Sequence, residues 1–293
     1  MARTKILATW LTAAIAALLT GCDSKPRVVI GSKNFAEQLL LGEIAAQQIE
    51  RRLHIPVERK LQIGGTLLAH EALVKGDIDL YPEYTGTALT AVLKRAVNAD
   101  PSAVLTEVRS GYKQWNLVWL DPLGFNNTFA MVTLRAGADA RHVRTLSEAG
   151  AFRPGWKLGA GYEFVQRADG LEGLKKAYGL QMTEPPRTMD LGLLYAALEQ
   201  KQVDLAAANS TDGQLSNEKF LALEDDKHYF PPYQAAFVVR ESSFAKFPGL
   251  ESALKELSGS LTTEAMRDLN HQLEGLHRPG PKVAAEWLAK LKP

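Results

Sequence analysis

The chain has 293 residues, of which 46% are apolar, and it carries 34 Lys and Arg side chains against 33 Asp and Glu. This length suffices to bury the cores of two lobes, and a charge balance so close to neutral gives no electrostatic basis for binding nucleic acid. Residues 1–22 predict a secretory leader, because Arg3 and Lys5 precede an apolar run from Ile6 to Leu19 that is too short to span a membrane.

The end of this leader, Leu-Leu-Thr-Gly-Cys, resembles a lipobox, in which the cysteine is lipidated and becomes the mature N-terminus. Cys22 is the only cysteine, which favours lipidation over an ordinary leader with an incidental cysteine. We expect residues 1–21 to be removed and residues 22–26 to form a lipidated tether. No second apolar run reaches spanning length, so lipid alone would anchor the chain. Asp23 resembles the signal that retains lipoproteins at the periplasmic face of a Gram-negative inner membrane.

The first elements of the mature chain alternate between strand and helix. A strand over 27–31 leads into a helix whose apolar residues recur every three or four positions. Ser32 or Asn34 is placed to cap this helix, and Glu37 to reach back to Asn34 as in a capping box. A second strand (57–63) and a second helix (66–74) follow. This alternation predicts a parallel sheet with right-handed crossovers.

The stretch 76–87 is the most informative. A buried strand is predicted to stop at Pro82, which has no N–H to donate to a sheet, and a helix to begin near Thr85. Tyr84 and Thr87 would then lie at the carboxyl end of a strand, where open α/β sheets bind ligands. Free N–H groups at a helix start suit an anion, and a tyrosine ring suits a cation. The pattern indicates a small zwitterion, although packing for Tyr84 and a helix cap for Thr87 are simpler interpretations.

The rest of the chain predicts two lobes that are connected twice. We expect lobe I to comprise residues 27–128 and 234–293, and lobe II to comprise residues 129–233, with strands 129–134 and 235–239 at the crossings. Further strands are expected over 117–120 and 156–160. Helices are predicted near 101–114, 163–178, 190–201, 248–258, 262–276 and 281–291, with one short helix in the loop-rich residues 136–155.

An internal echo links the two lobes. Residues 198–205 repeat the layout of residues 73–80, and the same offset sets Asn209 against Tyr84 and Asp212 against Thr87. If the echo is a repeat and not a chance match, two lobes of similar construction face each other with strand-end loops on both sides of a cleft.

No residue pattern for catalysis is present. The sequence contains no Gly-x-Ser-x-Gly elbow, Walker loop, His-Glu-x-x-His or Cys-x-x-Cys, and its six histidines do not pair at metal-ligand spacing. The acidic pairs Asp77–Asp79 and Asp225–Asp226 are interpreted as solvated turn residues in preference to an acid/base dyad. We therefore predict no enzyme activity, no cofactor and no metal.

Five motifs in order carry a family resemblance: Ser-Lys-Asn-Phe-x-Glu-Gln (32–38), Tyr-Pro-Glu-Tyr-Thr-Gly-Thr (81–87), Gly-Phe-Asn-Asn-Thr (124–128), Ser-Thr-Asp-Gly (210–213) and Phe-Pro-Pro-Tyr (230–233). Together they resemble the substrate-binding proteins of ABC importers for glycine betaine, choline, carnitine and related osmoprotectants. The resemblance implies an α/β, two-lobed periplasmic-binding-protein fold of type II, with the ligand cleft between the lobes and two crossover segments.

The same resemblance implies an aromatic box for a quaternary ammonium, with basic and hydroxyl groups for its carboxylate. Tyr84 and Tyr233 would be walls of this box. Phe129 and Asn209 stand where the family usually has tyrosines. The groups that would hold the carboxylate are Lys33, Thr87 and Arg167, the last in Glu-Phe-x-x-Arg-x-Asp-Gly.

The two departures bear on the solute. Phe129 keeps a π face but has no hydroxyl, whereas Asn209 removes a face and adds an amide. At roughly 0.5–2 kcal/mol per cation–π face, one lost face weakens binding by a few-fold to about thirtyfold. The solute is therefore a betaine bound weakly, or a different compound that uses the Asn209 amide, such as an amino-acid betaine with a polar side group.

We predict a lipid-anchored, extracytoplasmic receptor that delivers a small quaternary-ammonium solute to a separate permease and ATPase. One alternative is a receptor for another solute, such as ergothioneine or an amino-acid-like compound. A less favoured alternative is a cell-envelope lipoprotein enzyme on the same fold.

Overall fold

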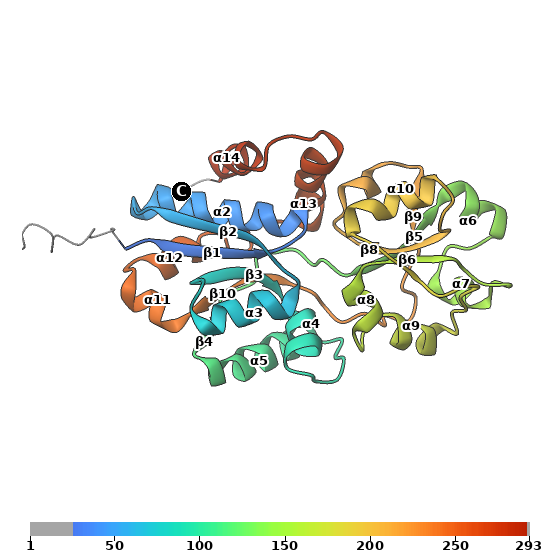
Figure 1. Ribbon diagram of the computed structural model, residues 1–293, viewed down its shortest axis with the longest axis horizontal. Helices are drawn as coiled ribbons and strands as arrows, with labels where there is room; N and C mark the ends of the chain where they lie inside the picture. Colours follow the sequence, from blue (N-terminus) through green and yellow to red (C-terminus); the bar gives the residue numbers. More distant parts are fainter. Residues whose placement is uncertain (1–25, 292–293) are drawn as a thin grey trace, which may run out of the picture.

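Two lobes lie side by side in the computed structural model, each built on one five-stranded sheet (Figure 1). The structure describes residues 26–291, so the predicted leader and the lipidation of Cys22 lie outside the described residues. Lobe I has the strand order β2-β1-β3-β10-β4 and lobe II the order β7-β6-β8-β5-β9. The strands of lobe I are β1 (Val28–Lys33), β2 (Val57–Gly64), β3 (Leu80–Tyr84), β4 (Leu117–Trp119) and β10 (Ala235–Arg240). Those of lobe II are β5 (Phe129–Leu134), β6 (Leu158–Ala160), β7 (Arg187–Thr188), β8 (Leu205–Asn209) and β9 (Phe220–Ala222).

The two sheets have the same topology, so the lobes are of similar construction, as the internal echo predicted. In each sheet the central strand runs parallel to one neighbour and antiparallel to the other: β3 to β1 and β10, β8 to β6 and β5. The predicted parallel arrangement holds for the first three strands, while the returning strand runs antiparallel. Tyr84 pairs with Ala235 and Asn209 pairs with Phe129, so Tyr84 and Asn209 end equivalent strands.

Helices cover both faces of each sheet (Figure 1). In lobe I, α2 and the last helices bury one apolar cluster, and α3 and α5 bury another on the opposite face. The helices of lobe I are α2 (Ala36–Leu53), α3 (Thr66–Lys75), α4 (Thr85–Thr87) with the π-helix η2 (Ala88–Val92), α5 (Pro101–Tyr112), α11 (Glu241–Lys246), α12 (Leu250–Lys255), α13 (Thr263–Asn270) with the π-helix η6 (His271–Gly275), and α14 (Gly280–Lys290). Those of lobe II are α6 (Arg135–Arg141), α7 (Leu146–Ala151), α8 (Tyr162–Gln166), α9 (Leu171–Tyr178), the 3₁₀ turn η4 (Leu191–Leu193), α10 (Leu194–Glu199) and the 3₁₀ turn η5 (Gly213–Ser216).

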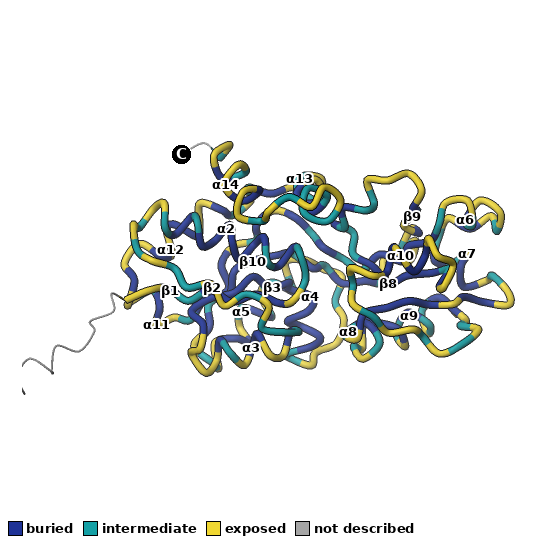
Figure 2. Tube along the Cα trace, turned by 45° about the horizontal axis from the view of Figure 1, so that its top comes forward, coloured by how far each residue is buried: buried dark blue, intermediate teal, exposed yellow. Residues whose placement is uncertain are grey.

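Local chemistry fixes several of these boundaries. Asp100 caps α5 through Ser102 N and Ala103 N, and proline follows at the first helical position. Gly76 ends α3 at φ 85°, a left-handed conformation that glycine adopts without strain. The central strands, which are buried on both faces, form the dark core of each lobe in Figure 2. The strand ends are thereby held rigidly at the border between the lobes.

Pro82 does not stop its strand, contrary to the prediction. Thr85 N donates to Gln234 O and Arg240 N donates to Asp79 O, so the odd-numbered residues of β3 exchange hydrogen bonds with β10. Pro82 pairs with Phe237 at a position between these bonds, where its missing N–H faces away from β10. The strand therefore continues to Tyr84.

The predictions for two segments of lobe II were wrong. Residues 136–155 hold two helices, α6 and α7, the second with a complete capping box between Thr145 and Glu148. The predicted helix over 163–178 is broken into α8 and α9. A Cβ on Gly170 would lie 1.9 Å from Phe164 O, so the chain doubles back there at a distance that only glycine permits. In lobe I, α11 was not predicted.

The prediction that the acidic pairs are solvated turn residues fails for one member of each. Asp79 is buried, where its carboxylate accepts hydrogen bonds from Val29 N (2.8 Å) and Ser243 Oγ (2.6 Å). Asp225 accepts from the backbone N–H groups of Tyr229 and Phe230. Both carboxylates therefore tie loops to the fold.

The chain crosses between the sheets twice, and the two crossings are bonded to each other. Asn127 N donates to Tyr233 O at 3.0 Å, and Tyr233 N donates to Asn126 Oδ1 at 2.6 Å. Asn126 and Gln234 form an isolated antiparallel bridge. The crossings thus form a short two-stranded ribbon beneath the cleft. Strands β1–β4 and β10 lie on one side of it and β5–β9 on the other, while the exact lobe boundaries stay a prediction.

Candidate functional site

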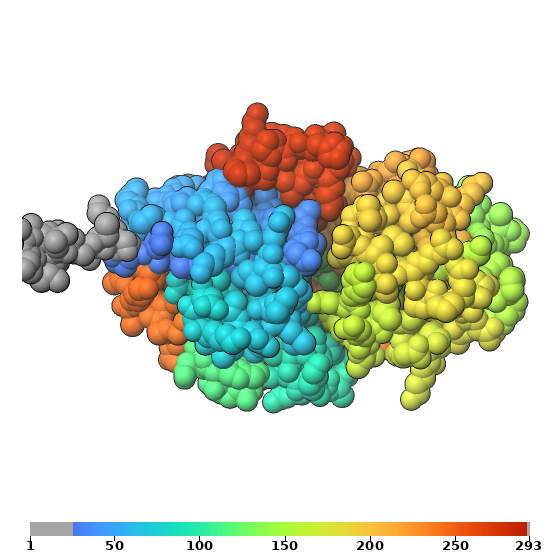
Figure 3. Space-filling model, in the orientation of Figure 1, coloured from blue at the N-terminus to red at the C-terminus, as the bar shows by residue number. Residues whose placement is uncertain are grey.

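A cavity of about 740 Å³ lies between the two lobes, within the range of small-molecule sites. Figure 3 shows the lobes abutting along the border that contains it. All seven residues predicted to bind ligand line this cavity: Lys33, Tyr84, Thr87, Phe129, Arg167, Asn209 and Tyr233. Lys33, Tyr84 and Asn209 end strands β1, β3 and β8, as expected for a site at the carboxyl edge of α/β sheets.

Arg167 is held by an acid, a hydroxyl and two rings. Its guanidinium binds Asp169 in a bidentate manner, with Nε 2.9 Å from Oδ1, and Nη1 donates to Thr87 Oγ1 at 3.0 Å. Its Cζ atom lies 5.1 Å from the ring centroid of Phe129 and 5.4 Å from that of Tyr233. Burial works against the charged form of Asp169, yet the hydrogen bonds from Arg167 hold the pKa of Asp169 below its usual value.

Lys33 is held in a similar way in lobe I. Its Nζ lies 2.7 Å from Glu83 Oε1, and both side chains are buried. The same Nζ lies 4.7 Å from the ring centroid of Tyr84 and 5.8 Å from that of Phe35. The rings predicted as walls of an aromatic box thus each carry one of the protein's own cations on a face. The predicted residues converge, and their roles toward a solute stay a prediction.

Glu37 is a central residue of the site, and the predicted capping box is wrong. The N-cap of α2 is Phe35, and no side chain caps the helix. Instead the buried Glu37 carboxylate accepts hydrogen bonds from four segments of the chain. The donors are Tyr84 OH (2.6 Å), Asn127 Nδ2 (2.8 Å), Thr211 Oγ1 (2.6 Å) and Asn270 Nδ2 (2.8 Å). Burial and the Glu37 charge together raise the pKa of Tyr84 well above its usual value, so its hydroxyl stays a donor.

The signal for Glu37 was present in the sequence but was interpreted differently. Asn127 belongs to the Gly-Phe-Asn-Asn-Thr motif and Thr211 to the Ser-Thr-Asp-Gly motif, which carried the family resemblance while no role was predicted for these two residues. The structure explains part of each motif as support for one carboxylate. Such support fixes the ring of Tyr84 and joins both lobes at one point.

A second acidic group that lines the cavity was not foreseen in the sequence. Asp212 Oδ2 accepts from Asn209 N and from Tyr195 OH, each at 3.0 Å. Burial raises the pKa of Asp212 to about 6 and that of Glu274 to about 7, where the charges of Asp212 and Glu37 add to the shift. Tyr195 lies in α10, Asp212 directly precedes η5 and Glu274 lies in η6, and only the tertiary fold brings these segments together. In the described part of the chain neither carboxylate has an ion-pair partner, whereas Lys33 and Arg167 both do.

Comparison with known proteins decides the family. Residues 26–290, nearly the whole described chain, match the family described as "Substrate binding domain of ABC-type glycine betaine transport system". The chain belongs to this family of substrate-binding domains. Membership confirms the resemblance drawn from the five motifs, and it confirms the prediction that the chain is not an enzyme, because the family consists of solute-binding domains.

The chain is similar to several members and relatives of this glycine betaine family. It is 35% identical over 271 residues to the "Ergothioneine transport permease/ergothioneine binding protein" of Helicobacter pylori, covering 92% of this chain and 48% of that protein, so it spans about half that relative. It is 30% identical over 273 residues to the "Carnitine transport binding protein" of Listeria monocytogenes, covering 92% of this chain and 88% of that protein. Among solved structures, a "glycine betaine/carnitine/choline ABC transporter" protein superposes with a TM-score of 0.75 at 31% identity, covering 90% of this chain and 98% of the other.

These likenesses confirm the predicted fold, the two-lobed periplasmic-binding-protein fold of type II. Within residues 26–291 no helix is both long enough and apolar enough to cross a membrane. The same residues contain no group of three or more His, Cys, Asp or Glu side chains arranged to hold a metal ion. The cavity of this chain is lined by aromatic rings, by the two ion-paired cations Lys33 and Arg167, and by the acidic side chains of Asp212 and Glu274.

Proposed function

We propose that the chain is the lipid-anchored, extracytoplasmic binding component of an ABC importer. It captures a small quaternary-ammonium zwitterion such as glycine betaine or carnitine and delivers it to a separate permease and ATPase. The observation that supports this proposal best is the convergence of three aromatic rings and two buried cations on one cavity between two lobes. Family membership and the names of the relatives support the same solute class.

The chemistry of such a solute fits the aromatic rings and cations that line the cavity. A trimethylammonium group has no N–H to donate, so the faces of aromatic rings are its best partners in a protein. The free faces of Tyr84, Phe129 and Tyr233 would take that group. Thr87 Oγ1, oriented by Arg167, and the remaining guanidinium donors would take the carboxylate. Closure of the lobes would then exclude water from both ends of the solute.

Calorimetry with glycine betaine, carnitine and choline tests the proposal. Arg167→Ala is expected to weaken binding of the two zwitterions by tenfold or more, on the order of 1.5–3 kcal/mol for a charge-assisted hydrogen bond, and to weaken choline less. Equal losses for all three compounds would remove the carboxylate role from Arg167. Failure of the unmodified protein to bind any quaternary ammonium would overturn the solute class.

A second candidate solute class is favoured by the acidic side chains that line the cavity, Asp212 and Glu274. Glycine betaine has no hydrogen-bond donor, whereas Asp212 and Glu274 are acceptors that lack a cationic partner in the described part of the chain. A betaine with N–H groups at its far end, such as ergothioneine, would supply donors to them, and the relative in Helicobacter pylori is named for that compound. Asp212→Asn is expected to weaken ergothioneine and leave glycine betaine unchanged if this candidate is right.

A further inference from the structure

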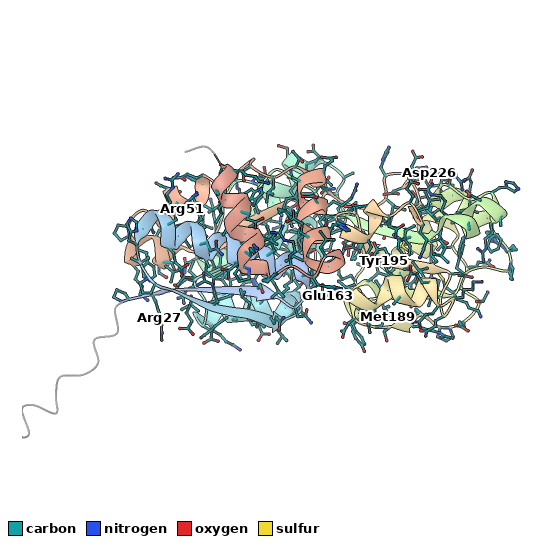
Figure 4. All side chains as sticks on the ribbon, turned by 90° about the horizontal axis from the view of Figure 1, so that it is seen from above. Arg27, Arg51, Glu163, Met189, Tyr195 and Asp226 are labelled. Carbon is teal, nitrogen blue, oxygen red and sulfur yellow. The ribbon has the colours of Figure 1, made fainter. Side chains whose placement is uncertain are left out.

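The segment after β6 contains three charged residues, and threonines of lobe I bind each of them across the cleft. Arg167 binds Thr87 and Asp169 binds Thr90, as part of the site described above. Glu163, the third, has no part in the carboxylate or ring chemistry proposed for the solute. It lies at the border between the lobes in Figure 4.

Glu163 binds the first residue of α3. Its Oε1 accepts from Thr66 N at 2.7 Å and its Oε2 from Thr66 Oγ1 at 3.1 Å. Helix α3 begins after Gly65 and has no capping side chain of its own, so the Thr66 N–H is one of the donors that a helix start leaves unpaired. The carboxylate of lobe II therefore supplies the cap that the sequence of lobe I lacks, at the helix end that favours negative charge.

Two further observations show that the contact between Glu163 and Thr66 is part of the site. Lys33 Nζ lies 3.4 Å from Thr66 Oγ1, so a chain of polar groups runs from Glu83 through Lys33 and Thr66 to Glu163. A Cβ on Gly65 would lie 2.7 Å from Glu163 Oε1. The carboxylate thus approaches the backbone at a point where a larger residue would displace it.

We propose that Glu163 is a positioning residue that latches the lobes: its carboxylate, carried by lobe II, binds the start of α3 in lobe I and stabilises the closed form around the solute. The proposal rests on the two-lobed receptor role but not on which solute is bound. Closure contributes to affinity, because a latch that favours the closed form lowers the cost of reaching it when solute binds.

Glu163→Gln removes the charge while keeping the shape, and three measurements follow its effect. We expect affinity for the best-bound solute to fall about tenfold, the loss typical of a charge-assisted hydrogen bond. Without solute, we expect a larger radius of gyration by small-angle scattering and faster hydrogen exchange at the Thr66 amide. Glu172→Gln is the matched control, since that glutamate lies in α9 of the same lobe with 75% of its side chain exposed, and it should change none of the three.

Gly65→Ala provides a second, charge-neutral variant. Gly65 has φ −76°, which alanine adopts freely, so the substitution should displace the Glu163 carboxylate and not disrupt the fold. Alone it should weaken binding about as much as Glu163→Gln. In a Glu163→Ala background it should add less than about twofold, because contacting residues are not additive.

The outcomes separate this proposal from the proposed function. Lower affinity with unchanged compactness and unchanged Thr66 exchange would place Glu163 on the solute and overturn the latch. Additive effects of Gly65→Ala and Glu163→Ala would overturn it as well. If the unmodified protein binds no quaternary ammonium, the proposed solute class fails, while scattering and exchange without solute still decide for or against the latch.

Discussion

The ends of β3 and β8 occupy the same place in two sheets of the same topology, yet they carry different chemistry. Tyr84 ends β3 with a ring that lies against Lys33 and a hydroxyl bound to Glu37. Asn209 ends β8 with an amide, and its backbone N–H binds Asp212. The fold of the two lobes is repeated, while the side chains at the repeated position are not. The end of β3 is therefore aromatic and lies against a cation, whereas the end of β8 is an amide whose backbone binds an acid.

The largest expected effect concerns Glu37, which supports Tyr84 at the end of β3 and contacts Thr211 in lobe II. Glu37→Ala leaves the hydroxyls of Tyr84 and Thr211 and the amides of Asn127 and Asn270 without their acceptor. We expect the free energy of unfolding to fall by about 3–5 kcal/mol, as for other broken buried polar networks. Chemical denaturation measures it. A loss below about 1 kcal/mol would show that the donors find other partners.

The next comparison sets Tyr84→Ala against Asn209→Ala. If the ring of Tyr84 contacts the ammonium and the amide of Asn209 does not, Tyr84→Ala should weaken glycine betaine binding by about thirtyfold or more, the upper range for one lost ring face. Asn209→Ala should change it less than about threefold. Calorimetry at one pH measures both, and equal losses would make the two strand ends equivalent in function as well as in fold.

The two acidic side chains beside the end of β8 should make the stability of the protein depend on pH. Burial raises the pKa of Asp212 to about 6 and that of Glu274 to about 7, so both carboxyls retain their protons in the folded chain at a pH where they have lost them when unfolded. Their contribution is fully present below about pH 4 and is lost as the pH rises through 6 and 7. We expect Asp212→Asn to reduce that loss by on the order of 1–2 kcal/mol, measured by denaturation at pH 5 and pH 8.

The smallest expected effect comes from making the two strand ends alike. Asn209→Tyr restores the ring that the family usually has there. Glycine betaine should then bind a few-fold more tightly if the aromatic box lacks only this ring. Weaker binding, or none, would indicate that the native solute uses the amide. The variant should retain the thermal stability of the parent for this test to count.

Sequence patterns predicted the architecture well because it depends on periodicity and repetition. The echo between residues 73–80 and 198–205 corresponds to two equivalent helix-to-strand connections, which lead into β3 and β8. The seven side chains that the family resemblance named all line one cavity. Pro82 was misjudged because its tolerance depends on pairing register, which the local sequence does not contain. The break at Gly170 was missed for a similar reason, since it arises from a close approach to Phe164 O.

The polar interior of the site could not be predicted from local patterns. Glu37 looked like a capping residue because its position in the helix permits that role, but donors far away in the chain determine its real one. Asp212, Tyr195 and Glu274 come from three separate elements, and their shifted pKa values result from burial. Clusters of titratable side chains from separate segments, such as this one, form only when the chain folds.

The ribbon formed by the two crossings has a mechanical consequence. Because Asn126 and Asn127 are bonded to Tyr233 and Gln234, the connections cannot bend independently, and twisting or sliding of one sheet against the other would break those bonds. We therefore expect the lobes to move relative to each other mainly by rotation about this ribbon as a hinge. One distance across the mouth of the cleft would then follow that rotation.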